Sequence, residues 1–236
     1  MKDLIPRFIG EKKWDKSPRT RKFVVSGCGR SGTLYMAKVL NILGFEVGHE
    51  GVHRNGTSSW YLTEPSHANY IKAQFYEHNV TYIHIVRNPL NVITSMWHCE
   101  HMKSRFALDF VREYLPQWEL GYDLEAVVKW WVLWNMGTST NFPIDITLPI
   151  EQLQLPDAVY SFCEKARIKY TPKKFQKIVA LGEKTHTHRR LLLDSLKKDY
   201  GEDFLKTLTI EDIANECGGE LTGVLKDFAK NYGYTL

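Results

Sequence analysis

A group of glycines around an arginine stands between an apolar run and a helical pattern near the start of the chain. Gly27, Gly29 and Gly32 surround Arg30 in the segment SGCGRSGT. Glycines at such a turn let the backbone approach a ligand, and a helix that begins near Thr33 directs its free N–H groups and positive dipole end back into the turn. This combination indicates a binding site for an anion, above all a phosphate.

The glycine spacing alone does not select the ligand. Gly27, Gly29 and Gly32 satisfy the dinucleotide-binding pattern G-x-G-x-x-G, and the first and last of them also satisfy the P-loop spacing G-x-x-x-x-G. In a dinucleotide-binding protein an acidic residue about 20 positions further on holds a ribose, and Glu46 or Glu50 could serve. An NAD(P)-dependent oxidoreductase is therefore one alternative.

The residues after the glycines do not fit a nucleoside triphosphatase. That pattern requires Lys and then Ser or Thr after Gly32, but Thr33 and Leu34 follow, and the cation is Arg30 within the loop. The apolar run IHIV ends at Arg87, where a metal-binding carboxylate would be needed. Sulfuryl transfer fits better, because a sulfuryl group carries less negative charge than a phosphoryl group and a fixed cation can stabilise it without a metal.

The elements that position these residues follow from the hydrophobic pattern. Apolar runs over 23–25, 81–86 and 145–150 predict strands, and a helical period predicts a helix over 34–43. Strands that alternate with helices of this length imply an α/β fold with a mainly parallel sheet covered on both faces, and with the ligand at the carboxyl ends of the strands. The glycine turn and Arg87 both lie at such ends.

Two further features complete the predicted architecture. The segment 48–62 is rich in Gly, Ser and His without any period, so we expect a long functional loop. Tryptophans 130, 131 and 134 form an apolar stripe typical of a helix core, of which one face could also line an acceptor pocket. Helices are expected over 65–78, 89–102, 107–118, 124–140, 157–166, 172–181, 190–199, 211–216 and 220–231.

Length and composition fit a single α/β domain with a helical C-terminal third. The chain has 236 residues, of which 43% are hydrophobic and 25% charged, and we expect a basic arm over 1–22 followed by the domain over 23–236. The net charge of +4 is too small for a diffuse nucleic-acid-binding surface. The cysteines show no metal-ligand spacing, and no signal peptide or apolar stretch of about 20 residues is recognisable. We expect a soluble, cytoplasmic protein without disulfides, metal or membrane span.

Two motifs resemble those of a known family. The segment GRSGT (29–33) is similar to the 5′-phosphosulfate loop of the P-loop sulfotransferases, especially the tyrosylprotein and carbohydrate sulfotransferase branch, whose loop also reads R-S-G-T. The second family signature is a strand followed by Arg, seven residues and Ser. Arg87 and Ser95 satisfy it, with Pro89 shortly after the arginine.

The resemblance covers residues 23–100 well and residues 130–135 and 149–153 more faintly, and it does not extend past about residue 165. It implies a doubly wound fold of the P-loop type and the donor 3′-phosphoadenosine 5′-phosphosulfate (PAPS), whose product is adenosine 3′,5′-bisphosphate. Within the glycine turn, the resemblance implies that backbone N–H groups from Gly29 to Thr33 bind the 5′-phosphosulfate, with Cys28 also part of the binding loop.

The same resemblance implies roles for individual side chains. Arg30 would neutralise the bridging and leaving oxygens, and Ser31 and Thr33 would add hydroxyl hydrogen bonds. Cys28 is interpreted as a small loop residue rather than a redox group, since no resolving cysteine is recognisable near it. Arg87, through a forked charge-assisted contact, and Ser95 would hold the 3′-phosphate.

The acceptor hydroxyl must lose its proton as it attacks sulfur, so a base is expected near the loop. Glu50 occupies the place at which the tyrosylprotein branch carries its catalytic glutamate, and His49 and His53 are the rival bases. Residues 58–60 could line the acceptor site or form an ordinary loop. The basic cluster at 186–190 could close over the nucleotide or begin a solvated helix.

The sequence therefore predicts a metal-independent sulfotransferase that acts on a hydroxyl of an unidentified small-molecule, carbohydrate, lipid or peptide acceptor. Besides the oxidoreductase, a nucleotide-binding regulator without catalytic activity remains an alternative.

Overall fold

The computed structural model of the chain describes residues 21–76, 78–98, 111, 123–182 and 207–236. The chain forms two compact units, of which the first comprises Met1–Val86 with Asn135–Glu183 and the second Arg87–Trp134 with Lys184–Leu236. The division into a basic arm and one domain over 23–236 stays a prediction.

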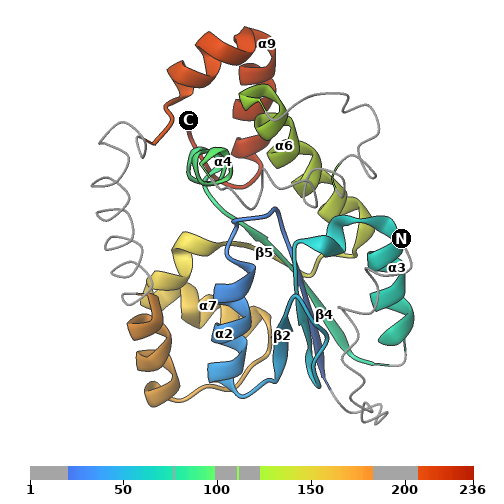
Figure 1. Ribbon diagram of the computed structural model, residues 1–236. Helices are drawn as coiled ribbons and strands as arrows, with labels where there is room; N and C mark the ends of the chain where they lie inside the picture. Colours follow the sequence, from blue (N-terminus) through green and yellow to red (C-terminus); the bar gives the residue numbers. More distant parts are fainter. Residues whose placement is uncertain (1–20, 77, 99–110, 112–122, 183–206) are drawn as a thin grey trace. The chain divides into compact units, whose positions relative to one another are not determined.

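The first unit is built on a five-stranded sheet with the strand order β2-β3-β1-β4-β5, in which every neighbouring pair is parallel (Figure 1). Helices connect β1 to β2, β3 to β4 and β4 to β5, as parallel strands require. This confirms the predicted α/β fold with a mainly parallel sheet. The strands are β1 (Lys22–Ser26), β2 (Val47–His49), β3 (Gly56–Ser58), β4 (Val80–Val86) and β5 (Ile146–Pro149).

One face of the sheet carries the larger hydrophobic core. Phe23 and Val25 of β1 and Ile83 and Ile85 of β4 are buried there, because side chains at alternate positions of a strand share a face. Burying each such side chain contributes about 1.5–3 kcal/mol. The helices that cover this face are α2 (Thr33–Leu43), α7 (Pro156–Lys165) and the helical residues 172–182.

The opposite face packs against α3 (Pro65–Gln74), which lies on the other side of the sheet from α2 (Figure 1). Val24 belongs to this second core, and Tyr82 stacks on Phe142 with ring centroids 5.4 Å apart. α3 begins at Pro65 as predicted, and the Glu64 carboxylate accepts the first backbone N–H groups of the helix. Both faces are therefore covered, which explains why β1 and β4 carry apolar residues on both of their sides.

A buried polar group continues the second face toward the carboxyl ends of the strands. His84 of β4 lies beside Ser26 in register. Its Nε2 lies 3.0 Å from Oδ1 of Asn135, and its Nδ1 lies 3.3 Å from Oγ of Ser139. Since an amide oxygen can only accept a hydrogen bond, Nε2 is the donor to Asn135. Burial lowers the pKa of His84 to about 4, against a smaller opposite effect of the Asn135 hydrogen bond. The imidazole is therefore neutral at physiological pH.

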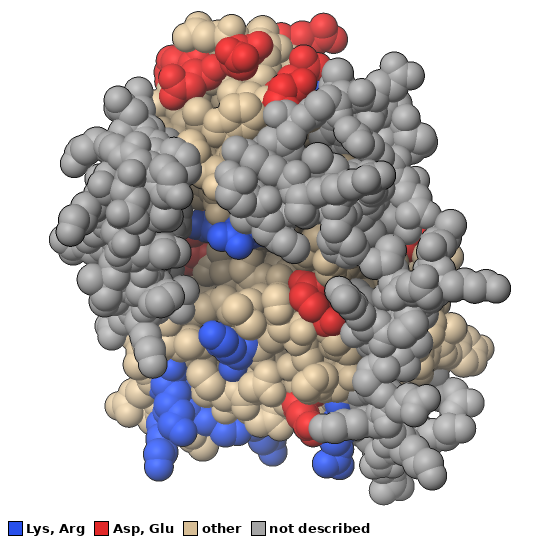
Figure 2. All heavy atoms as spheres, in the orientation of Figure 1, with Lys and Arg blue, Asp and Glu red and all other residues tan. Residues whose placement is uncertain are grey.

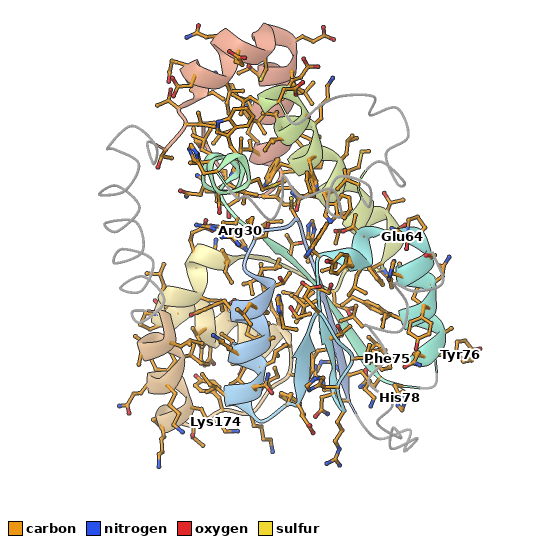
Figure 3. The ribbon with its side chains drawn as sticks, in the orientation of Figure 1. Arg30, Glu64, Phe75, Tyr76, His78 and Lys174 are labelled. Atoms are coloured by element: carbon orange, nitrogen blue, oxygen red, sulfur yellow. The ribbon has the colours of Figure 1, made fainter. Side chains whose placement is uncertain are left out.

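α2 is bounded by glycines in left-handed conformation. Gly32 precedes it with φ 99°, and Gly44 follows it with φ 105° and donates its N–H to the last turn. Nζ of Lys174 donates to the last helical carbonyl, that of Leu43, at 2.6 Å. Figure 3 shows Arg30 and Lys174 at opposite ends of this helix, and Figure 2 shows Lys and Arg side chains gathered over the helical residues 172–182. The predicted helix over 34–43 is confirmed to within one residue.

The prediction of a long loop over 48–62 is wrong, because this segment contains β3 and the 3-10 helix Tyr61–Thr63. β3 pairs with both β1 and β2 and is fully buried. At Gly56 (φ 130°) a Cβ atom would lie 1.9 Å from the carbonyl oxygen of Phe23, so only glycine fits where the two backbones meet. A strand of Gly, Thr and Ser carries no apolar pattern by which it could be recognised.

The start of the sheet also differs slightly from expectation. β1 begins at Lys22, which was predicted to lie in the basic arm. Its side chain is buried, with Nζ donating to the carbonyl of Arg54 at 2.5 Å and lying 5.6 Å from the centroid of the Phe75 ring. The rest of the predicted arm, residues 1–20, lies outside the described residues.

The second unit contains α4 (Pro89–Trp97), the first part of α6 (Leu124–Asn141) and α9 (Ile210–Lys230). In its core, the ring of Trp131 meets those of Phe228 and Tyr232 edge to face, which agrees with the predicted tryptophan stripe.

α9 covers the two helices predicted over 211–216 and 220–231. Thr209 and Asp212 form a capping box at its start, and Gly218 (φ 80°) kinks it between the two predicted helices. α4 ends at Trp97, short of the predicted residue 102. The helix predicted over 190–199 lies outside the described residues, as does the one predicted over 107–118 except for Val111, which is helical and buried. Within the described ranges, no helix has both the length and the apolar character needed to cross a membrane.

Candidate functional site

The glycine turn connects the carboxyl end of β1 to the start of α2. Gly27 and Gly32 are required in it for different structural reasons. A Cβ at Gly27 would lie 2.1 Å from the carbonyl oxygen of Ile85, so β4 leaves room for no side chain there. Gly32 has a left-handed backbone. Arg30 is also left-handed, with φ 67°, and its side chain is exposed. A left-handed non-glycine residue costs about 1–2 kcal/mol, a strain that is often found at functional sites.

Among the described residues, no side chain caps the start of α2. Its first backbone N–H groups have no partner within the helix. Gly32 provides no side-chain cap, and the first turn contains no acidic residue. Oγ of Ser31 is completely buried and has no hydrogen-bond partner among the described residues. Unsatisfied N–H groups, a positive dipole end and a buried hydroxyl together suit an anion with several acceptor oxygens.

Cys28 lies in the same turn with its side chain fully buried. Burial raises the pKa of its thiol, so the thiolate that redox chemistry requires is disfavoured. The geometry therefore agrees with the interpretation of Cys28 as a small loop residue.

Glu50 follows β2 directly and also has a left-handed backbone, with φ 54°. Its Oε2 accepts a hydrogen bond from Oγ of Ser59 at 2.5 Å, and the backbone N–H of Trp60 donates to the same carboxylate. The side chain is 27% exposed. Burial raises the pKa of Glu50 to about 7, although the hydrogen bonds from Ser59 and Trp60 act in the opposite direction. A carboxylate with this pKa can accept a proton near neutral pH.

His49 connects Glu50 to the glycine turn. Its Nε2 lies 3.2 Å from Oε1 of Glu50 and 3.2 Å from Oγ1 of Thr33, the first residue of α2. Burial, and secondarily the charge of Lys38, lower the pKa of His49. We therefore interpret its contact with Glu50 as a hydrogen bond of a neutral imidazole rather than an ion pair. The structure thus brings together three residues that the sequence proposed for separate roles.

His53, the other rival base, is not brought to this group. Its backbone closes a tight turn with Gly56 at the amino end of β3, and its ring lies over Gly48. In the described part of the chain it forms no hydrogen bond or ion pair with Glu50.

Ser58 and Ser59, for which both an acceptor site and an ordinary loop were considered, make internal contacts. Oγ of Ser58 donates to the carbonyl oxygen of Thr33 at 2.7 Å, and Ser59 binds Glu50. Trp60 is buried, with its ring centroid 4.3 Å from that of Tyr61. Burial, with a further effect of the Glu50 charge, raises the pKa of Tyr61 to about 12, so the phenol is protonated. Sequence reasoning missed the link between Ser59 and Glu50, because it depends on the unrecognised strand β3.

Arg87 and Ser95 belong to the second unit. Arg87 directly follows the last residue of β4, and the next residue, Asn88, accepts the N–H of Asn91 at 3.3 Å and so begins α4. Ser95 lies within α4, and both side chains are partly exposed. A strand, the arginine and then a helix that carries the serine form the local structure that the motif predicted.

The basic cluster at 186–190 lies outside the described residues. Among the described His, Cys, Asp and Glu residues, no three are grouped so that they could hold a metal ion.

No protein-family model matches the chain, and no curated protein matches its sequence. Among solved structures, the mouse sulfotransferase SULT7A1 complexed with PAP aligns with 98% of this chain and 94% of that chain, at 12% sequence identity and a TM-score of 0.39. A likeness of this degree adds nothing to the assignment of the fold, which rests on the strand order and the parallel register.

Proposed function

We propose that the protein is a PAPS-dependent sulfotransferase that transfers a sulfuryl group to a hydroxyl of an acceptor. The observation that carries the proposal is the contact of one imidazole, that of His49, with both Thr33 at the start of α2 and the carboxylate of Glu50. It joins a turn suited to an anion to a carboxylate whose pKa is about 7. Group transfer from an anionic donor to a hydroxyl needs both parts.

The glycine turn would bind the 5′-phosphosulfate. Backbone N–H groups between Gly29 and Thr33, apart from that of Ser31, which donates to the carbonyl of Cys28, would donate to its oxygens together with the hydroxyls of Ser31 and Thr33. Arg30 would neutralise charge on the bridging and leaving oxygens. The buried hydroxyl of Ser31, which has no partner among the described residues, supports this role. So does the start of α2, where no side chain of the described part of the chain caps the helix.

The chemistry requires one proton transfer. The acceptor oxygen attacks sulfur, the bond between sulfur and the bridging oxygen of the 5′-phosphate breaks, and adenosine 3′,5′-bisphosphate leaves with the electron pair. The acceptor proton passes to Glu50. Arg30 stabilises the charge that develops on the leaving oxygen, which is the usual contribution of a fixed cation in such a transfer.

Arg87 and Ser95 would hold the 3′-phosphate of the donor. The support for this part is their spacing and the local structure around them, in which Arg87 follows β4 and Ser95 lies in α4. Guanidinium groups bind phosphate through two parallel hydrogen bonds, which gives both energy and orientation.

The strand order argues against the oxidoreductase alternative. In dinucleotide-binding proteins the acidic residue that holds the ribose follows a strand adjacent to the first one. Here β3 lies between β1 and β2, and Glu50 at the end of β2 already accepts hydrogen bonds from Ser59 and Trp60. Glu46, the other candidate, lies before β2 rather than after it.

A comparison of ligands by thermal stability tests the proposal. Adenosine 3′,5′-bisphosphate, AMP, ATP with Mg²⁺, and NAD are added in turn, and a ligand at about 100 times its dissociation constant adds about 2.7 kcal/mol of stability. We expect the largest shift with the bisphosphate, and its loss in Arg87→Ala. Lys177→Ala, which removes an exposed cation from the helical residues 172–182, should leave the shift unchanged.

A shift with NAD alone would contradict the proposal and favour the oxidoreductase. A bisphosphate shift without any transfer of labelled sulfate to carbohydrate, lipid, phenol or peptide acceptors would favour the inactive regulator. Formation of a labelled sulfate ester on one acceptor class would establish both the reaction and the class.

A further inference from the structure

Ser59 is placed to fix the orientation of the Glu50 side chain. Its own side chain is fully buried, and its backbone N–H donates to the carbonyl of Val25 in β1 at 2.9 Å. Its hydroxyl donates to Oε2 of Glu50 at 2.5 Å and at the same time accepts the N–H of Tyr61 at 3.1 Å. Because the oxygen accepts from Tyr61, the hydrogen of the hydroxyl points to Oε2 of Glu50.

We propose that Ser59 is the positioning residue of Glu50, and that it holds the carboxylate so that Oε1 is the oxygen that accepts the proton of the acceptor hydroxyl. This inference rests on the proposed function. It concerns a residue that touches neither donor nor acceptor and acts only through Glu50.

The geometry distinguishes the two carboxylate oxygens. Oε2 is occupied by Ser59, whereas Oε1 lies 3.2 Å from Nε2 of His49, the atom that also contacts Thr33. Oε1 is therefore the oxygen on the side of the glycine turn. A carboxylate oxygen has two lone pairs, so a hydrogen bond from His49 still leaves Oε1 able to accept a proton.

A free glutamate side chain would not keep this arrangement, since it rotates about several bonds and gains entropy by doing so. The left-handed backbone of Glu50 sets the direction in which the side chain leaves β2, and Ser59 fixes its far end. The second donor, the N–H of Trp60, belongs to the same short segment after β3. Orientation within a few tenths of an ångström is what such catalytic groups require.

Two titratable side chains of the described residues interact with Glu50. His49 contacts it directly, and Tyr61 is coupled to its charge. Lys38 of α2 acts on His49. Among these contacts Ser59 is the one that donates a hydrogen bond to Oε2 from a side chain, so its removal should change the titration of Glu50 directly.

The test is Ser59→Ala, followed by the pH dependence of turnover and by ¹³C NMR titration of the Glu50 carboxyl carbon. Loss of a donor disfavours the carboxylate, so the pKa of Glu50 should rise by about one unit. From about 7, where half of Glu50 is ionised at pH 7, a rise to about 8 leaves about a tenth ionised. Turnover at pH 7 should then fall at least about fivefold, with part of the loss recovered at high pH.

Thr57→Val is the matched control. It removes another buried hydroxyl from the adjoining strand β3, one without a hydrogen-bond partner among the described residues. We expect no change in the titration of Glu50. If Ser59→Ala does not fold, Ser59→Cys keeps a similar volume with a weaker donor and should shift the pKa in the same direction by a smaller amount.

The two readouts separate the inference from the proposed function. NMR needs no turnover, so a shifted Glu50 titration in a protein that transfers no sulfate would support the positioning and refute the sulfotransferase. An unchanged titration in both Ser59 variants would overturn the positioning role, whatever the activity. If Ser59→Ala lowers the stability but does not shift the pH at which turnover rises, Ser59 contributes to packing alone.

Discussion

Nε2 of His49 lies 3.2 Å from Oε1 of Glu50, and through the same nitrogen the carboxylate is linked to the hydroxyl of Thr33 at the start of α2. The contact therefore joins the glycine turn, which follows β1 and is suited to an anion, to a carboxylate that follows β2. Both parts carry backbone strain. Of the described non-glycine residues with positive φ, Arg30 and Glu50 belong to this site, and the third, Arg167, lies just after α7.

Replacement of this carboxylate should separate binding from chemistry. Glu50→Gln keeps the size of the side chain but cannot accept a proton, so turnover should fall by about 10²–10⁴-fold. The thermal shift with adenosine 3′,5′-bisphosphate should remain, because Glu50 does not contact the donor in the proposed mechanism. In the unmodified protein, turnover should rise with pH through about 7, since burial raises the pKa of Glu50 to that value and only the ionised form is a base.

Glu46→Gln, which changes an exposed carboxylate four residues earlier, is the control and should leave the pH profile unchanged. Undiminished transfer by Glu50→Gln would move the role of the base to His49.

His84 predicts a pH dependence of stability in the first unit. Its pKa is lowered to about 4 by burial, whereas an unfolded histidine titrates near 6.5. Between these values the unfolded chain binds more protons than the native one, so stability is lost as the pH falls through this window. The expected loss is on the order of 3 kcal/mol. His84→Gln removes the titration and should flatten the dependence, as measured by urea denaturation at a series of pH values.

The exposed His53 provides the comparison for that measurement. His53→Gln should keep the full acid sensitivity of the parent protein. If the free energy of unfolding changes with pH equally in the parent protein and both variants, other groups cause the acid sensitivity.

The parts that could be predicted from the sequence are those encoded locally. α2 was predicted to within one residue, because a helical period lies between two glycines and those glycines take left-handed conformations at its ends. Pro65 and Pro89 marked the starts of α3 and α4 for a similarly local reason, since proline fits the first helical turn. The carboxyl-end position of the glycine turn followed from the alternation of strands and helices.

The parts that were missed depend on contacts between distant segments. β3 is buried because its backbone fits between β1 and β2. Its residues Gly56, Thr57 and Ser58 have no apolar pattern from which a strand could be predicted. Without β3, the approach of Ser59 to Glu50 could not be foreseen. The partner of His84, Asn135, likewise lies 51 positions away in the sequence.

The buried hydroxyl of Ser31 permits a test of the anion site itself. Because Oγ of Ser31 has no partner among the described residues, Ser31→Ala removes an unsatisfied polar atom and should raise the stability of the ligand-free protein by about 1 kcal/mol. If the turn binds the 5′-phosphate, the same change removes a hydrogen bond to a charged group. The affinity for adenosine 3′,5′-bisphosphate should then fall by about 10-fold or more, as measured by calorimetry.

Thr57→Val shares the first effect but not the second, since Thr57 is equally buried without a partner among the described residues and lies in β3, outside the turn. Opposite signs for stability and affinity in Ser31→Ala, beside unchanged affinity in Thr57→Val, would place the ligand at the turn. If both variants bind the bisphosphate as tightly as the parent protein, the hydroxyl of Ser31 does not contact the donor, and the anion-binding role of the turn has to rest on its backbone N–H groups and Arg30 alone.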